Sequence, residues 1–277
     1  MRTCDVTVVG GGFAGVVAAR ELSRAGRDVV VLEGRDRLGG RTWYKPKALS
    51  GRTLELGGTW VHWLQPHVWA EITRYGLEVE ESLGSSAAEE VLYVTGGQRR
   101  SAMLPDLWAV MEEANERFCF DAAEVLPRPH DPLFDEEAIA AIDGFSVQDR
   151  IDKLDLSVEQ RDVLNALWAT CSSAPCSQAG LVSMLRWYAL AGWNLGLMFD
   201  AVARYKLKRG TGALVEAIGR DSAAEVRLST AVERIEQRSD AVTVTTRGAT
   251  SCSRRWPSSP FRSTPSGGST SSPSSRV

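Results

Sequence analysis

One segment, from Val6 to Glu33, constrains the fold of this chain more than any other. It opens with a β-branched run at residues 6–9, which suits a buried parallel strand. A glycine turn with the spacing G-x-G-x-x-G follows at residues 10–15, and residues 13–25 carry apolar side chains at helical spacing. A second strand is expected over residues 28–33. The order strand, glycine turn, helix and strand predicts a βαβ unit that binds a dinucleotide.

The three glycines of the turn have separate roles. Gly10 permits the tight turn, Gly12 lets a pyrophosphate approach because it has no Cβ, and Gly15 lets the helix pack close to the strand. The helix N-terminus, where Ala14 lies, offers N–H groups and a positive dipole end to phosphates. Glu33 follows at the distance expected of a carboxylate that binds a ribose. The alternative is a glycine-rich turn that binds nothing.

A second glycine motif indicates which dinucleotide is bound. Residues 35–43, Arg-Asp-Arg-Leu-Gly-Gly-Arg-Thr-Trp, resemble the R-x-G-G-R motif of the flavin-containing amine oxidases. Residues 54–62 are similar to that family's next signature, a Gly-Gly turn beside the flavin ring. The resemblance covers about residues 5–248 and implies FAD as the cofactor. Arg41 would supply a cation and paired donors to the pyrophosphate, the alternative being an ordinary surface arginine.

The resemblance implies a set of cofactor-binding residues. Val232 matches the family segment whose valine clamps the adenine through its backbone. No catalytic residue and no metal ligand is assigned, because the family's flavin-contacting lysine and its substrate-orienting aromatic pair have no counterpart here. The expected cofactor-binding residues are Gly10, Gly12, Ala14, Gly15, Glu33, Arg35, Gly40, Arg41, Gly57, Gly58, Thr59, Trp60 and Val232.

The resemblance also implies the fold. We expect an α/β fold, a FAD-binding Rossmann-like domain of the GR2 type with an inserted, mainly helical substrate domain and with its C-terminal portion missing. Residues 1–82 would be the FAD-binding segment, residues 83–205 the helical insertion, and residues 206–250 the return to the FAD-binding domain.

Helix signals are frequent in the expected insertion. Ser146 and Ser157 each begin a stretch that matches or approaches the capping-box pattern and precedes an apolar run. Trp168, Trp187 and Trp193 either line an apolar substrate cavity or pack in the core, and core packing is favoured for any single one.

The last segment, residues 251–277, differs in composition from the rest. Eleven of its 27 residues are serine and four are proline, so it is expected to be disordered. It is either a low-complexity linker or a tail translated out of frame. The abrupt change after a normal strand pattern favours the second explanation.

Charge and cysteine usage exclude several functional classes. The net charge of −3 gives no reason to expect binding to nucleic acid or to an anionic membrane. No run of about 20 apolar residues is present, so no membrane span is expected. The five cysteines form no C-x-x-C pair, which indicates reduced thiols and neither a metal site nor a disulfide. The first strand begins too early for a signal peptide, and a cytoplasmic enzyme is expected.

The resemblance implies a FAD-dependent amine oxidase. It would convert a primary or secondary amine to an aldehyde or ketone, with O2 as the oxidant and H2O2 as a product. We expect the 277-residue chain to be inactive. The full-length form could be a monomer or a homodimer. The alternatives are a non-catalytic FAD-binding remnant or another flavoenzyme on the same scaffold, a desaturase or an amino-acid oxidase. A nicotinamide dehydrogenase would leave the arginine–glycine motif unexplained.

Overall fold

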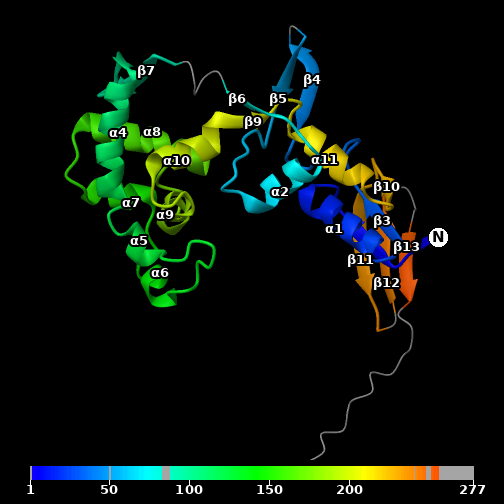
Figure 1. Cartoon of the computed structure of the whole chain (residues 1–277). Helices are drawn as coiled ribbons and strands as arrows, with labels where there is room; N and C mark the ends of the chain where they lie inside the picture. Colours follow the sequence, from blue (N-terminus) through cyan, green and yellow to red (C-terminus); the bar gives the residue numbers. More distant parts are fainter. Residues whose placement is uncertain (1, 50, 83–87, 240, 248–250, 256–277) are drawn as a thin grey trace, which may run out of the picture. The chain divides into compact units, whose positions relative to one another are not determined.

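The computed structural model describes residues 2–49, 51–82, 88–239, 241–247 and 251–255 (Figure 1). The chain has a mixed α/β structure and divides into two compact units. Unit 1 comprises residues 1–40 and 219–277, and unit 2 comprises residues 41–218. These limits differ from the changes expected near residues 82 and 205, so the division into cofactor and substrate domains stays a prediction.

A helix and two sheets make up the described part of unit 1. The parallel sheet has the strand order β10-β3-β2, and the other sheet has the order β1-β13-β12-β11. Strands β11, β12 and β13 are antiparallel and lie side by side in Figure 1, whereas β1 runs parallel to β13. The elements are β1 (Arg2–Thr3), β2 (Val6–Val9), α1 (Phe13–Arg24), β3 (Val29–Leu32), β10 (Glu225–Arg227), β11 (Val232–Gln237), β12 (Ala241–Thr246) and β13 (Ser251–Arg255).

Strand β3 is buried on both faces. Val30 and Leu32 pack in one apolar cluster with Val244 of β12, and Val29 and Val31 pack in another with residues of α1. Successive side chains of a strand point to opposite faces, so the continuous apolar sequence of β3 matches its place between a helix and a second sheet. The expected strand–turn–helix–strand order is confirmed, and Gly26, with φ +74°, follows the end of α1.

The expectation of no packed structure from residue 251 onward is wrong for its first five residues. They form β13, which pairs with β12 on one side and β1 on the other. A β-ladder uses the N–H and C=O groups that every residue except proline carries, so a serine- and arginine-rich segment can pair where two strand edges are available. Residues 256–277 lie outside the described residues.

Unit 2 is mainly helical, with three two-stranded antiparallel sheets in its described part. The sheets pair β4 with β5, β6 with β9, and β7 with β8. The strands are β4 (Tyr44–Leu49), β5 (Arg52–Glu55), β6 (Val79–Glu81), β7 (Glu90–Thr95), β8 (Gln98–Met103) and β9 (Tyr205–Leu207). The helices are α2 (Pro66–Arg74), α4 (Leu104–Phe118), α5 (Ala122–Val125), α6 (Glu136–Ile142), α7 (Val147–Lys153), α8 (Val158–Ser172), α9 (Leu181–Leu190), α10 (Leu195–Phe199), the π-helix η1 (Asp200–Arg204) and α11 (Thr211–Arg220), whose last two residues belong to unit 1.

One apolar cluster holds helices α4 to α10 of unit 2 together. Trp168 of α8 is fully buried and its ring lies 5.3 Å from that of Phe118 of α4, centroid to centroid. The predicted capping boxes are both confirmed, with Ser146 beginning α7 and Ser157 beginning α8. In the described residues of the whole chain, no helix combines the length and the apolar character needed to cross a membrane.

Candidate functional site

The three glycines of the turn in unit 1 differ in what they require: Gly10 has a positive φ, Gly15 is closely packed, and Gly12 is open. Gly10 has φ +97°, and its N–H donates to the carbonyl of Leu32 at 2.8 Å. A Cβ on Gly15 would lie 1.9 Å from the carbonyl oxygen of Gly10, so only glycine fits there. A Cβ on Gly12 would meet only the Cα of Gly40, at 3.9 Å. Gly12 is therefore not required for packing, and its open surface is available to a ligand.

Helix α1 begins at this open surface. Gly12 is its N-cap residue, and no side chain caps the helix. The first N–H groups of an α-helix have no acceptor within the helix, and they carry the positive end of its dipole. Ala14, in the first turn, is exposed and small. The start of α1 thus has the properties of an anion-binding site.

Glu33 is held next to the glycine turn. Its side-chain Oε2 accepts the N–H of Gly11 at 2.7 Å, and Oε1 accepts the N–H of Arg35 at 2.8 Å. Its own carbonyl accepts the N–H of Thr230 at 2.7 Å. Only 5% of Glu33 is exposed. Each carboxylate oxygen has a second lone pair, so the fixed carboxylate can still accept hydrogen bonds from hydroxyl groups.

The second glycine motif packs against the first. The N–H of Gly39 donates to the carbonyl of Gly11 at 2.8 Å, and a Cβ on Gly40 would lie 3.3 Å from the Cα of Gly12. Arg37 fixes this loop, because its guanidinium donates to the carbonyls of Leu38 and Gly40 at 3.2 and 3.1 Å. The sequence analysis missed Arg37, although it is the first arginine of the R-x-G-G-R motif.

Arg35 and Arg41, in contrast, have exposed side chains. Among the described residues, neither side chain forms a hydrogen bond or an ion pair. A free, exposed guanidinium can bind a phosphate in a bidentate manner, but its exposure equally fits a solvent-facing arginine.

Val232 lies at the start of β11, where the pairing with β12 is irregular. Val232 pairs with Thr246, and the register shifts before Arg234. A Cβ on Gly34 would lie 3.6 Å from that of Ala231, so the residue before Val232 borders the loop after Glu33. Unit 1 therefore brings together the glycine turn, Glu33 and the segment of Val232. The expected cofactor residues found in unit 1 are Gly10, Gly12, Ala14, Gly15, Glu33, Arg35, Gly40 and Val232, and those in unit 2 are Arg41, Gly57, Gly58, Thr59 and Trp60.

In unit 2, the pair Gly57-Gly58 packs against the backbone of Arg41 and against Thr42. A Cβ on Gly57 would lie 2.3 Å from the carbonyl oxygen of Arg41. Gly58 has φ +69°, and its Cβ would lie 2.9 Å from Oγ1 of Thr42. Chain packing alone therefore requires glycine at both positions. Thr59 is half-buried beside this pair, and Trp60 is 38% exposed.

Trp60 lines the larger of two apolar cavities described in unit 2. The cavity has a volume of about 660 Å³ and borders the π-helix η1. Its polar side chains include Asp200 and Arg204, whose ion pair has an N–O distance of 3.2 Å. Since these two charges neutralise each other, the cavity suits an apolar, uncharged ligand. The lining residues are Trp60, Ser82, Ala88, Val91, Leu104, Leu107, Trp108, Met111, Gly196, Phe199, Asp200, Ala203 and Arg204.

His62, two residues after Trp60, is fully buried. Its Nδ1 accepts the N–H of Leu64 at 3.1 Å, and Nε2 has no hydrogen-bond partner among the described residues. Burial lowers the pKa of His62, and the negative charge of Asp200 partly opposes this effect. The imidazole is therefore neutral at pH 7, with its proton on Nε2. The sequence analysis assigned no role to His62.

The three tryptophans of the insertion have different environments. Trp168 is core, as favoured from the sequence. Trp187 lines the second cavity of unit 2, and Trp193 is 36% exposed with φ +54°. In the part of the chain that the structure describes, no cluster of three or more histidine, cysteine or acidic side chains could hold a metal ion. Among the described residues, Cys4, Cys119, Cys171 and Cys176 form no disulfide.

Comparison with known proteins is consistent with this geometry. Residues 13–254 match the family model described as flavin containing amine oxidoreductase. The chain is 44% identical over 247 residues to a pseudooxynicotine dehydrogenase of a Pseudomonas species, covering 89% of this chain and 49% of that protein. It is 41% identical over 242 residues to a nicotine dehydrogenase of Pseudomonas putida, covering 87% and 50%. The chain thus spans about half the length of these curated relatives.

A solved structure of wild-type putrescine oxidase bound to putrescine is similar in fold. The TM-score is 0.70 at 24% sequence identity, and the match covers 92% of this chain and 56% of that one. The described residues therefore share the fold of a little over half of that chain.

Proposed function

The chain belongs to the flavin-containing amine oxidoreductase family, and on that premise we propose that its glycine turn and Glu33 bind FAD for the oxidation of an amine. The observation that carries the proposal is the open backbone at Gly12 beside the fixed carboxylate of Glu33. A pyrophosphate needs close access to the N–H groups at a helix start, and a ribose needs a rigid acceptor. Both features adjoin in unit 1.

Each expected cofactor residue has a role under this proposal. The N–H groups at the start of α1, near Ala14, would bind the pyrophosphate, and Glu33 would accept the ribose hydroxyls. The backbone of Val232 would contact the adenine. In unit 2, Gly57, Gly58, Thr59 and Trp60 are our candidates for the flavin end, and Arg35, Gly40 and Arg41 for the pyrophosphate.

Bound FAD supplies the acceptor for the hydride that leaves the carbon next to the amine nitrogen. The chain's own contribution to this reaction would be the 660 Å³ cavity that Trp60 lines. Apolar walls such as Trp108 and Phe199 exclude water. Asp200 is the acidic side chain among the described lining residues, and because it is already paired with Arg204 it does not favour a protonated amine. The cavity would therefore bind the neutral amine, the form from which hydride can leave.

We propose an amine with an aromatic or alkyl body as the substrate of the whole protein. The relatives named for nicotine and pseudooxynicotine support this class, as does the aromatic lining of the cavity. The oxidant is a separate question, because these two relatives are named dehydrogenases and a more distant one is a (S)-6-hydroxynicotine oxidase. We propose that O2 is the oxidant. The competing outcome is that turnover needs an artificial electron acceptor in place of O2.

FAD binding by the 277-residue chain is tested with the variant Gly12→Ala. The added methyl group fits the protein, so the fold should be kept, but the methyl occupies the space that a pyrophosphate needs. We expect FAD affinity, measured by quenching of flavin fluorescence, to fall about tenfold or more, the equivalent of about 1.4 kcal/mol. Gly144→Ala is the matched control, since a Cβ there meets no atom within 4 Å. Equal FAD affinity of the Gly12→Ala variant and the parent chain would refute the proposed site.

Turnover is tested separately. We propose that oxidation requires the half of the relatives that this chain does not match, so the chain should bind FAD without oxidising amines. A protein that carries both halves should oxidise an arylalkylamine and release H2O2 in air. If amine oxidation occurs only when an electron-accepting dye is added, O2 is not the oxidant. If the 277-residue chain itself oxidises amines, the second half is not required.

A further inference from the structure

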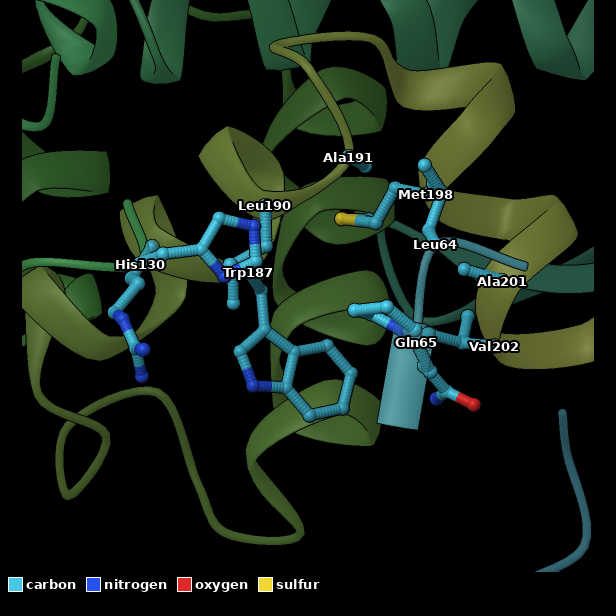
Figure 2. Close-up of a pocket in the computed structure, with 11 residues that line it drawn as sticks. Leu64, Gln65, His130, Trp187, Leu190, Ala191, Met198, Ala201 and Val202 are labelled. Carbon is cyan, nitrogen blue, oxygen red and sulfur yellow. The ribbon is translucent and has the colours of Figure 1, made fainter. Parts of the chain in front are cut away.

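The second cavity of unit 2 has a volume of about 330 Å³ and a different chemistry from the first (Figure 2). Helices α9 and α10, the π-helix η1, the start of α2 and the loop at His130 contribute to it. In the view of Figure 2, the indole of Trp187 stands between His130 on one side and Gln65 on the other. Leu190, Met198 and Val202 add apolar surface. The cavity therefore offers an apolar floor with polar groups at its edge.

Three side chains of this cavity, those of Arg186, His130 and Gln65, carry N–H groups that can donate hydrogen bonds. Arg186 is half-buried, and its Nε donates to the carbonyl of Pro129 at 2.8 Å, which fixes the guanidinium. Its two Nη groups form no further hydrogen bond or ion pair among the described residues. His130 and the amide of Gln65 lie on the same cavity. None of the described lining residues is acidic. An amine cation would meet only a like charge here, whereas an anion would find a fixed guanidinium.

We propose that this cavity binds a small organic carboxylate with an apolar body. Arg186 would bind the carboxylate in a bidentate manner, because the Nη groups of a guanidinium form a planar fork that matches its geometry. The ring or alkyl chain would lie against Trp187 and Leu190, out of water. This site is separate from the cavity proposed for the amine.

The two cavities share one wall. Ala201 and Val202 of η1 line the carboxylate cavity, and Asp200 and Ala203 of the same π-helix line the cavity that contains Trp60. Single turns of π-helix occur often at functional sites. Because the segment is common to both cavities, its residues supply a matched pair of variants that distinguish them.

The test uses three compounds of similar size with the 277-residue chain, by titration calorimetry at pH 7.5. Phenylacetate carries a negative charge, 2-phenylethanol is neutral, and 2-phenylethylamine is positive. We expect phenylacetate to bind at least about tenfold more tightly than 2-phenylethanol, since a charge-assisted bidentate pair is among the stronger polar contacts. Phenylacetate binding no tighter than that of the alcohol would overturn the proposal.

Substitutions of Arg186 test whether phenylacetate binds in the proposed cavity. Arg186→Leu should weaken phenylacetate binding about tenfold or more, and Arg186→Lys should weaken it less, since the charge remains and the fork is lost. Arg99→Leu, at an exposed position on β8, is the control and should bind as the parent chain does.

If the Arg186 variants fail to fold, Ala201→Leu and Ala203→Leu show which of the two cavities binds phenylacetate. Ala201→Leu fills the carboxylate cavity and should reduce phenylacetate binding, whereas Ala203→Leu fills the other cavity and should not. The reverse pattern would place the carboxylate in the cavity that contains Trp60 and would refute the inference. The result is independent of FAD binding, so it and the proposed function can fail separately.

Discussion

The side chain of Glu33 accepts the backbone N–H of Gly11 at 2.7 Å, so the carboxylate expected to bind a ribose also holds the glycine turn in place. A second bond, from the N–H of Arg35, occupies its other oxygen at 2.8 Å. The residue therefore has a structural role before any ligand binds, and a loss of FAD binding on its substitution has two separable causes.

Glu33→Ala is expected to destabilise the protein as well as to weaken FAD binding. The substitution leaves the buried N–H of Gly11 without its acceptor, which costs about 1–3 kcal/mol of unfolding free energy. Urea denaturation without FAD measures this cost. Glu233→Ala, which removes only an exposed pair with Arg247, should change the unfolding free energy by less than about 1 kcal/mol. Unchanged stability of Glu33→Ala would mean that another acceptor replaces the carboxylate.

Gly15→Ala should destabilise the fold, whereas Gly12→Ala should leave the fold intact and weaken FAD binding. The methyl group at Gly15 would overlap the carbonyl of Gly10, so this variant should unfold at lower urea concentration or fail to accumulate. The methyl group at Gly12 is accommodated, so that variant should keep the parent's unfolding midpoint and lose only FAD affinity. The midpoint temperatures of thermal unfolding of the two variants test the predicted difference in stability. The prediction is wrong if these midpoints are equal.

The fold of unit 1 could be predicted largely from the sequence because its signals are local. The apolar run of β3, the periodicity of α1 and the glycine spacing between them each reflect neighbouring residues. Arg37 was missed because the motif gives only its place in the sequence, whereas its donation to the carbonyls of Leu38 and Gly40 depends on the conformation of the loop. Strand β13 was missed because its pairing depends on partners far away in the sequence.

The β7–β8 hairpin of unit 2 was also missed, although a signal exists. Gly96 and Gly97 both have positive φ, of +55° and +75°, as the two-residue turn of a hairpin requires. The strand before this turn alternates in burial, from Val91 to Thr95. The π-helix η1 and the two cavities that it separates leave no such pattern, because they arise from packing between helices.

Within unit 2, Glu55 of β5 is hydrogen-bonded to Thr211 at the start of α11. The carboxylate of Glu55 accepts the N–H of Thr211 at 2.7 Å and its hydroxyl at 3.1 Å, at the start of α11. Thr211→Val keeps the shape of the buried side chain and removes one of these bonds, which should lower the unfolding free energy by about 1 kcal/mol. Thr73→Val, at an exposed position of α2, is the control and should cost less. Equal costs in urea denaturation would show that the hydroxyl contributes nothing.

The last prediction concerns acid stability. Burial lowers the pKa of His62 below its ordinary value of 6.5, so the unfolded chain binds a proton at a pH where the folded chain does not. The contribution of neutral His62 to stability is complete above pH of about 6.5 and is lost as the pH falls toward the lower folded-state pKa, at up to about 1.4 kcal/mol per pH unit. His62→Asn keeps an acceptor for the N–H of Leu64 and cannot be protonated, so its unfolding free energy should fall less between pH 7 and pH 5. His67→Asn, at an exposed position on α2, is the control for the exchange of a histidine for an asparagine. Parallel curves for the parent and both variants in urea denaturation would mean that His62 is protonated as easily in the folded chain as in the unfolded one.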